Sequence, residues 1–526
     1  MLSSRPTTLA THGMIATPHY LATSAGLQVL EEGGTAMDAV IAANAVLTVV
    51  YPDQTAIGGD CFFLAWDAGT GETAAYNGSG PASRNADPLL LVDLGWTAMP
   101  AKGPFAVTIP GTIDAWFAGH ERFGRLEMTR LLAPAIGLAR DGFPVSPRLA
   151  AAIAAQAELV SQWPGLQSLV APGGAFPVAG ATIRFPALAT SLETIAREGR
   201  DAFYTGAIAE QIVGTMEDLG GWIDAEDLAG YRGEWVDSIA YTYRGVTIRT
   251  TAPNSQGLAT LMGLAMAERE DLGSTWGAAG HVHPLVEAAR RAYRVRSATI
   301  TDPRFVKIDV PDMLSTPAID ALWADYDPMQ ATASDPHVAG DTVYLCAVDA
   351  DGNAVSQIQS LFGAFGSAVV AGNTGILLQN RGSYFSLNPD RVNVLAPGKR
   401  TMHTLMASMI FDGDVLRGPI GSQGGDAQAL INLQLMTNLI DFGMEPQAAI
   451  EAPRWLLPSA DALALHLEDG FPAGTIQQLA ARGHEPTLIG AWNSGAGHAQ
   501  MIMRDPESGV LMGGADPRAD GAAAGY

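Results

Sequence analysis

Residues 342–361 read TVYLCAVDADGNAVSQIQSL. The first seven of them are β-branched, aromatic or otherwise apolar, which is typical of a strand. Asp349–Asn353 supplies a turn centred on Asp351-Gly352, and an Asp-Gly pair between two apolar runs is a strong hairpin signal. Antiparallel pairing puts Thr342, at the start of the first strand, and Ser360, near the end of the second, at the same end of the ladder. On this pattern alone, an ordinary core hairpin is the simplest interpretation.

Charge and composition exclude several classes of protein. The 526 residues include 30 Lys+Arg against 54 Asp+Glu, a net charge of 30 − 54 = −24, which argues against a nucleic-acid partner and against docking on anionic lipid. Hydrophobic residues make up 48% and charged residues 16%, so the chain is expected to fold. Only Cys61 and Cys346 are cysteines, which leaves no disulfide framework and no cysteine-based zinc site.

The sequence predicts a cytoplasmic protein without a membrane partner. No apolar run reaches the ~20 uninterrupted residues of a membrane span. The best candidate, residues 36–50, contains Asp38 and Asn44 and suits a buried core helix better. Residues 1–11 lack the apolar segment of a secretory signal.

Helical and strand patterns occur in clusters without a regular β-α-β alternation, although the length alone suggests two to four domains. Helices are predicted at Leu21–Glu31, Ala36–Val50, Pro147–Leu159, Ala187–Glu198, His283–Thr299 and Asp426–Phe442. Strands are predicted at Cys61–Asp67, Ile239–Tyr243, Thr342–Asp349, Ala354–Leu361 and Met406–Phe411.

Common cofactor and metal motifs are incomplete. His120-Glu121 lacks the second histidine of a metalloprotease helix, and His281 and His283 have no carboxylate at a recognisable ligand spacing. Neither a phosphate-binding loop nor a G-x-S-x-G elbow is present. We therefore expect neither a metal nor an organic cofactor.

Short stretches that lie in a fixed order along nearly the whole chain carry a family resemblance. The upstream stretches are Gly33–Val40, Tyr51-Pro52, Ile57–Asp60, Pro110–Thr112, Ala139–Phe143, Asp227–Tyr231 and Pro253–Gly257. The downstream stretches are Asp349–Val355, Gly375–Leu378, Pro397–Arg400, Gly421–Gly425 and Ala515–Arg518. Each is weak alone, but their order and spacing are specific. Together they resemble the γ-glutamyltranspeptidase family, and in particular its branch that contains oxamate amidohydrolase and acylase-like members.

This resemblance implies an α+β fold, the αββα sandwich of N-terminal-nucleophile hydrolases, with two stacked antiparallel sheets between helical layers. It also implies a precursor that cuts itself once, here between Asp341 and Thr342. A large fragment, 1–341, and a small fragment, 342–526, would then form a heterodimer that is one structural unit. A dimer of such heterodimers stays open, because oligomeric state cannot be read from the sequence.

The resemblance assigns Thr342 as the nucleophile. A threonine hydroxyl is weakly nucleophilic, but a free N-terminal amine beside it, with a reference pKa of about 7.7–8.0, suits a base at neutral pH. Ser360 corresponds to a family threonine that orients the nucleophile. Gly424 and Gly425 correspond to the pair whose backbone N–H groups bind the oxyanion. Without the resemblance, this glycine pair would be read as a plain turn.

The expected substrate pocket departs from the γ-glutamyl pattern at the groups that bind an amino acid. Asn77 lies where the family has a carboxylate-binding arginine, and Tyr384 where it has an ammonium-binding aspartate. A paired serine motif is replaced by His403-Thr404. Burying an ammonium group without an anion is costly, so a substrate with an α-amine is disfavoured. Simple packing is the preferred interpretation of Tyr384, and His403 is as plausible in the core as in the pocket.

Two further departures change the volume and charge of the pocket. Phe362 replaces an asparagine and fills space, whereas Arg381 replaces a glutamine and brings a planar cation suited to a carboxylate. The alternative for Arg381 is a structural ion pair with a nearby acid.

These residues predict a self-cleaving N-terminal-threonine amidohydrolase that forms an acyl-enzyme with a small carboxylate-bearing amide such as oxamate. One alternative is a γ-glutamyl hydrolase or transferase acting on glutathione-type amides. Another is an inactive relative with a binding role, which would require loss of the nucleophile, the second hydroxyl or the glycine pair.

Overall fold

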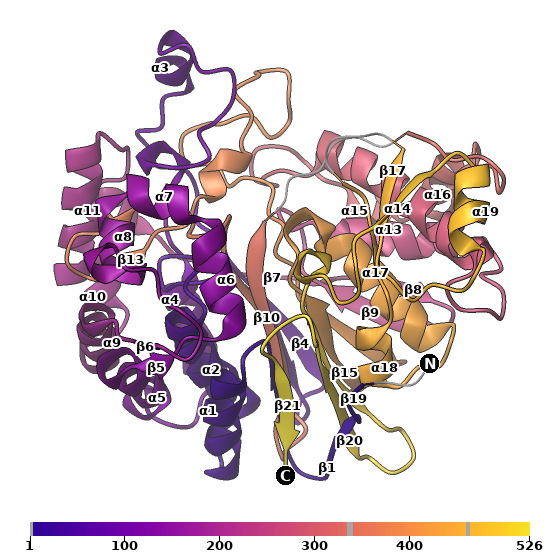
Figure 1. The fold of residues 1–526 in the computed structure, drawn as a ribbon, viewed down its shortest axis with the longest axis horizontal. Helices are drawn as coiled ribbons and strands as arrows, with labels where there is room; N and C mark the ends of the chain where they lie inside the picture. Colours follow the sequence, from indigo (N-terminus) through magenta and orange to yellow (C-terminus); the bar gives the residue numbers. More distant parts are fainter. Residues whose placement is uncertain (1–3, 334–339, 459–462) are drawn as a thin grey trace.

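Two seven-stranded antiparallel sheets form the centre of the molecule (Figure 1). The computed structural model describes residues 4–333, 340–458 and 463–526. The first sheet has the order β1 (Thr8–Ala10), β20 (Leu511–Ala515), β19 (Ala499–Arg504), β15 (Val415–Ser422), β14 (Ser408–Asp412), β9 (Val246–Thr250), β8 (Ile239–Tyr243). The second has the order β21 (Ala522–Gly525), β2 (Met14–Thr17), β10 (Asp341–Val348), β11 (Ala354–Phe362), β3 (Asp60–Asp67), β4 (Glu72–Gly78), β7 (Glu234–Val236).

The predicted hairpin is confirmed and lies in the middle of the second sheet. Val343 pairs with Gln359 and Val348 with Ala354. The pairing shifts at one end of the ladder, where Asp341 faces Phe362 across a bulge. Bulges locally re-aim side chains. The two hydroxyl residues therefore meet where the regular ladder stops.

Alternation along β10 divides its side chains between two apolar layers. Val343, Leu345 and Ala347 join the core under the helices that cover the second sheet. Tyr344 and Cys346 point the other way, into the layer between the sheets, where β14 contributes its own apolar side chains. A strand buried on both faces needs this continuous apolar character.

Helices cover the outer face of each sheet, which confirms the αββα layering (Figure 1). The helices beside the second sheet include α1 (Tyr20–Glu31), α2 (Ala36–Val50), α4 (Thr112–Phe123), α5 (Met128–Asp141), α6 (Pro147–Ala155), α7 (Ala157–Gln162), α8 (Pro164–Val170), α9 (Pro186–Glu198), α10 (Asp201–Tyr204) and α11 (Ala207–Leu219). Those beside the first sheet include α13 (Gly257–Ala267), α14 (Ala279–Thr299), α16 (Thr316–Trp323), α17 (Gln428–Ile440), α18 (Pro446–Glu451) and α19 (Thr475–Ala481).

The remaining elements are short and connect these layers. The short helices are α3 (Pro88–Asp93), which projects from the top of the molecule in Figure 1, α12 (Ala225–Gly230) and α15 (Val310–Met313). The 3₁₀ turns are η1 (Pro104–Ala106), η2 (Pro172–Gly174), η3 (Arg381–Tyr384), η4 (Gly425–Ala427) and η5 (Ser494–Ala496). Small sheets join β5 (Phe143–Pro144) with β6 (Thr182–Ile183), β12 (Val370–Ala371) with β13 (Ile376–Leu377), and β16 (Trp455–Leu456) with β17 (Ala464–Leu467) and β18 (Glu485–Leu488).

The predicted elements are present, although several of their ends differ by one to four residues. The helix predicted over 147–159 is two helices, because Gln156 leaves helical geometry at φ −105°, ψ 22°. Helix α14 begins four residues earlier than predicted and contains Pro284 in its second turn, where the proline has no N–H for the helical hydrogen bond. Strand β14 begins at Ser408, two residues later than predicted.

The predicted buried helix over 36–50 is confirmed, since every residue of α2 is buried. Thr35 and Asp38 form a capping box at its start. Among residues 4–333, 340–458 and 463–526, no helix is both long enough and apolar enough to cross a membrane.

After α2, Gly58 and Gly59 let the backbone approach its neighbours closely. A Cβ on Gly59 would overlap the carbonyl oxygen of Ser360, and one on Gly58 would overlap the carbonyl oxygen of Leu377. Glycine is required where two backbones meet in this way. The Gly58-Gly59 pair thus sets how near this loop lies to the second hydroxyl residue.

We expect Gly59→Ala to lower the free energy of unfolding by about 1–3 kcal/mol, because the added methyl forces β11 away from the loop. The midpoint of thermal denaturation measures this. Gly137→Ala in α5 is the control, since a Cβ there meets nothing within 4 Å and alanine favours a helix. Equal midpoints for the two variants would contradict the close-approach argument.

Candidate active site

Thr342 and Ser360 form a hydrogen-bonded pair of buried hydroxyls. The Thr342 Oγ donates to the Ser360 Oγ at 3.2 Å, and each residue is 1% exposed. Ser360 Oγ also accepts the backbone N–H of Phe362 at 2.6 Å. That bond depends on an unusual backbone, because Phe362 has a φ of +79°. The structure therefore brings the two predicted hydroxyl residues together and fixes the second one.

Two glutamines that the sequence analysis missed contact Thr342. Gln54, in the loop after α2, accepts the backbone N–H of Thr342 at 3.1 Å through its Oε1. Gln428, at the start of α17, donates its Nε2 to the Thr342 Oγ at 3.3 Å. Both side chains are buried. Each follows a stretch quoted above, Tyr51-Pro52 or Gly424-Gly425, which is the signal that could have identified it.

Gly424 and Gly425 adopt backbone conformations that favour glycine, with φ of +147° and +54°. They lead into η4 and then α17, and a Cβ on Gly425 would overlap the backbone nitrogen of Gly340. The chain just before Thr342 therefore lies directly against this pair. Within the described part of the chain, neither N–H of the pair donates a hydrogen bond. Both donors are thus available to an oxygen atom.

Arg381 lies in η3 with its guanidinium 4.1 Å from the centre of the Phe362 ring. Its Nη1 donates to Thr404 Oγ at 3.0 Å, whereas its Nε and Nη2 are buried with no hydrogen-bond partner in the described chain. The side chain is 1% exposed and forms no ion pair among the described residues. Burial lowers the pKa of Arg381 to about 10, although Asp60 opposes this shift. A structural ion pair, the alternative for Arg381, is not observed there.

His403 is a fully buried neighbour of Asp60. Its Nδ1 accepts the N–H of Leu405 at 3.2 Å, so its proton is on Nε2, which donates to Asp60 Oδ2 at 3.0 Å. Burial, together with Arg381, holds the pKa of His403 well below its usual value. Burial also raises the pKa of Asp60 to about 7, despite Arg381. Asp60 directly follows the Gly58-Gly59 pair and was not predicted as part of the site.

Tyr384 and Asn77 are held by other side chains. The Tyr384 hydroxyl donates to Asp426 Oδ1 at 2.6 Å, and its ring meets Phe362 edge-on at 5.4 Å. Asn77 donates to Asn254 at 2.8 Å and accepts from Ser79, so both ends of its amide are engaged by these side chains.

Asp426 is an acid that the sequence analysis overlooked immediately after the glycine pair. Besides the Tyr384 hydroxyl, it accepts from Arg296, which lies 3.2 Å away. The carboxylate is therefore already neutralised by a cation. It does not restore a free anion for a substrate ammonium group.

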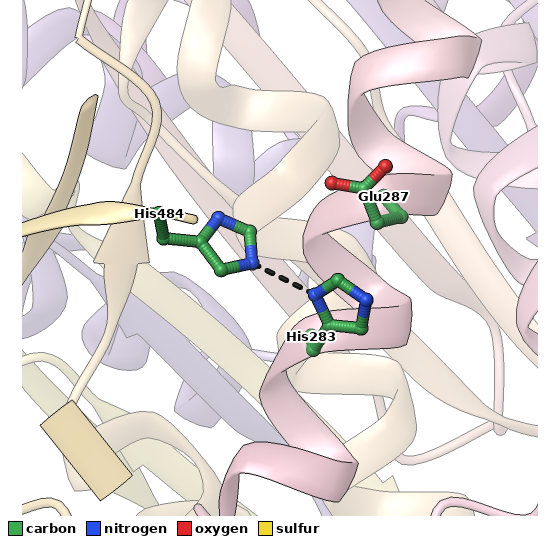
Figure 2. Close-up of side chains that lie close together, drawn as sticks. All are labelled: His283, Glu287 and His484. Atoms are coloured by element: carbon green, nitrogen blue, oxygen red, sulfur yellow. Dashed lines mark hydrogen bonds between the residues drawn. The ribbon is translucent and has the colours of Figure 1, made fainter. Parts of the chain in front are cut away.

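His283, Glu287 and His484 form a cluster of potential metal ligands away from these residues (Figure 2). Arg290 donates to Nδ1 of His484, whose Nε2 then donates to Nδ1 of His283 at 2.8 Å. The Nε2 of His283 in turn donates to the carbonyl of Asp327 at 2.9 Å. This series of hydrogen bonds uses every ring nitrogen of His283 and His484.

Glu287 is equally engaged, since it pairs with Arg290 at 3.0 Å and Arg291 at 2.7 Å and accepts from Thr332. Burial lowers the pKa of His484 to about 3, with Arg290 contributing, in keeping with a neutral ring. A divalent cation would have to displace both arginines. The cluster is therefore better explained as a hydrogen-bond network that holds residues 327–332 against α14 than as a metal centre.

The γ-glutamyltranspeptidase family model matches residues 22–526. The chain is 40% identical over 522 residues to the glutathione hydrolase-like YwrD proenzyme of Bacillus subtilis, covering 98% of this chain and 99% of that one. It is 38% identical over 532 residues to the oxamate amidohydrolase proenzyme of Klebsiella pneumoniae, again covering 98% and 99%. A solved structure of cephalosporin acylase from Bacillus halodurans matches with a TM-score of 0.95 and 37% identity, covering 100% of this chain and 98% of that one.

These matches confirm the predicted fold and the predicted class of amide-cleaving enzyme, while the substrate and the roles of individual residues stay predictions. Since the family model and the relatives span almost the whole chain, this chain belongs to the γ-glutamyltranspeptidase family of N-terminal-nucleophile hydrolases.

Proposed function

We propose that this protein is a self-cleaving N-terminal-threonine amidohydrolase whose substrate is a small amide bearing a carboxylate and no α-amine. The observation that carries the substrate class is the buried guanidinium of Arg381, which has two unsatisfied nitrogens and no ion pair in the described chain. An uncompensated buried cation is costly, and a substrate carboxylate would supply the missing charge.

Self-cleavage would begin with Thr342 Oγ. Attack on the carbonyl carbon of residue 341 forms an ester as the bond to the Thr342 nitrogen breaks, and that nitrogen gains a proton. Water then hydrolyses the ester, which leaves Thr342 with a free hydroxyl and a free amine. The contacts of Ser360 and Gln428 with the Oγ, and of residue 340 with the glycine pair, support this assignment.

In turnover, the new amine accepts the proton of Oγ as it attacks the amide carbon. The oxyanion would be stabilised by the N–H groups of Gly424 and Gly425. The amine's proton then passes to the departing nitrogen, and the C–N bond breaks to leave an acyl ester. Water hydrolyses this ester, releases the acid and regenerates the hydroxyl.

The surroundings of Arg381 support a short acyl group. Phe362 lies under the guanidinium and Tyr384 meets the phenyl ring edge-on, so apolar surface fills this side of the site. Asp426 is held by Arg296 and Tyr384 and offers no free anion to an ammonium group. Oxamate, an amide beside a carboxylate, combines the required groups.

The relatives also favour a second candidate, hydrolysis of glutathione-type γ-glutamyl amides. The relative at 40% identity is named glutathione hydrolase-like, and a glutathione hydrolase proenzyme of Escherichia coli is 31% identical over 545 residues. An inactive binding protein is less well supported, because the threonine, the second hydroxyl and the glycine pair are all present.

The proposed fragments, 1–341 and 342–526, would remain together as a heterodimer. Both sheets contain strands from each fragment: β10 and β11 lie between β2 and β3 in one, and β14 pairs with β9 in the other. Separating the fragments would therefore break both sheets.

We expect Thr342→Ala to abolish self-cleavage, because the variant lacks the attacking oxygen. A denaturing gel should show one band near 54.9 kDa for the variant and two bands for the parent protein. Thr342→Ser is the control, since serine keeps the hydroxyl and should still mature. An uncut chain in fully active parent protein, detected by mass spectrometry, would refute the assignment of Thr342.

We expect Arg381→Met to lower kcat/KM for oxamate by about 10²–10³-fold, because truncating a buried charged partner costs roughly 2–5 kcal/mol. Oxamide, the neutral analogue of similar size, is the matched substrate and should lose far less. The measurement is the ammonia that the matured enzyme releases from each substrate.

The parent enzyme is also assayed with γ-glutamyl-p-nitroanilide, whose hydrolysis releases p-nitroaniline instead of ammonia. A higher kcat/KM for that compound than for oxamate would favour the γ-glutamyl candidate. An equal loss on oxamate and oxamide would show that Arg381 does not bind a carboxylate.

A further inference from the structure

The loop after α2 touches the nucleophile through its nitrogen rather than its hydroxyl. Gln54 Oε1 accepts from the Thr342 nitrogen at 3.1 Å, and Gln54 is 6% exposed. In the proposed mature enzyme, this nitrogen is the terminal amine that acts as the base. Gln54 would therefore contact the base itself.

The orientation of the Gln54 amide is imposed by the residue before it. Gln54 Nε2 donates to Asp53 Oδ2 at 3.0 Å, so the oxygen of the amide must face Thr342. Asp53 can only accept here, because Arg148 of α6 donates to both of its oxygens at 2.9 and 2.7 Å. Burial alone would raise the pKa of Asp53, but Arg148 outweighs burial and holds the pKa below its usual value. The anion is thus permanent near neutral pH.

The backbone of this loop is tied to the strand that carries the second hydroxyl. The N–H of Leu361, next to Ser360, donates to the Gln54 carbonyl at 3.1 Å, and the N–H of Phe365 donates to the Asp53 carbonyl at 2.9 Å. Arg148 is held in turn over the ring of Tyr51 at 3.5 Å. The acceptor for the nitrogen and the partner of the hydroxyl therefore belong to one rigid unit.

We infer that Gln54, oriented by the Asp53–Arg148 ion pair, is a positioning residue for the terminal amine of Thr342. The inference rests on the proposed function. One N–H of the amine would point to Gln54 Oε1, which restricts rotation about the Cα–N bond and leaves the lone pair free to take the proton of the Thr342 Oγ. When the amine becomes an ammonium group, the same carbonyl stabilises the added charge.

A purely structural glutamine would not affect the titration of the base, so the pH dependence of activity separates the two roles. The acidic limb of kcat/KM reports the essential base of the free enzyme, whichever amide is hydrolysed. The charged and titratable groups of the elements around the site are Tyr51, Asp53, Asp60, Arg148, Arg296, Arg381, Tyr384, His403, Asp426, His498 and Asp520. All of them are retained in Gln54→Met, so a shift in the limb comes from the lost amide.

The experiment compares Gln54→Met with Gln434→Met in the matured enzyme. Methionine keeps the length of glutamine but neither accepts nor donates strongly. Gln434 is a buried glutamine on α17 whose amide bonds the backbone at Leu430 and Trp455, away from Thr342. We expect Gln54→Met to move the acidic limb about one pH unit lower and to reduce the plateau of kcat/KM about tenfold, because the ammonium form loses its acceptor. We expect Gln434→Met to leave the limb in place.

Maturation and thermal midpoints are recorded for each variant. If Gln54→Met does not mature, the pH profile of kcat/KM is measured on Asp53→Asn. In that variant, Gln54 loses the carboxylate that orients its amide, so the acidic limb should again move to lower pH. Failure of both to mature, with midpoints close to that of the parent, would also support the inference, because this nitrogen is the leaving group of self-cleavage. An unmoved limb, or loss of maturation together with loss of folding, overturns it. If the parent enzyme itself fails to mature or to cleave any amide, the proposed function fails instead.

Discussion

The hydrogen bond between the Thr342 and Ser360 hydroxyls depends on the register of β10 against β11, and most of the site depends on that register in turn. A slip of one residue would turn the side chains to opposite faces of the sheet. The Asp-Gly turn sets the register at one end, and the bulge at Asp341 ends it at the other. Ser360 is then held by the N–H of Phe362 and by the close approach of Gly59. The placement of the loop after α2 and of η3 beside Thr342 depends in turn on this central hairpin.

Charge around Arg381 is unbalanced in a way that favours an anionic ligand. The acid that most opposes the lowering of its pKa, Asp60, is itself buried deeply enough that its own pKa rises to about 7, so it is only a partial counter-charge near neutral pH. The other acid nearby, Asp426, is paired with Arg296. A buried guanidinium seldom lacks hydrogen-bond acceptors and a counter-charge unless another group supplies them. In the proposed reaction, that group is the carboxylate of the substrate, and the energy of pairing is available to position the neighbouring amide.

The sequence allowed the hairpin, the buried helix α2 and the pairing of the two hydroxyls to be predicted, because each follows from local periodicity or turn chemistry. The roles of Thr342 and the glycine pair came only from the family resemblance, since a threonine at the start of a strand is otherwise unremarkable. Gln54 and Gln428 were not predicted, because their contacts with Thr342 span 288 and 86 residues of sequence, and only their places beside the family stretches could have identified them. Asn77 shows the opposite case: alignment places it in the pocket, whereas its amide is used by Asn254 and Ser79. Long-range hydrogen bonds of this kind leave no periodic signal.

The position of the chain before Thr342 connects maturation to catalysis. The backbone of Gly340 lies where a side chain on Gly425 would be, so the uncut chain packs directly against the glycine pair. In the proposed reaction, the same N–H groups would first stabilise the oxyanion at residue 341 and later that of the substrate. The nitrogen that Gln54 contacts would likewise serve twice, first as the leaving group and then as the base. One set of contacts can serve both reactions because both break an amide bond at the same oxygen nucleophile. In the proposed reactions, a residue that improves one of them by placing the Thr342 nitrogen or oxygen should improve the other.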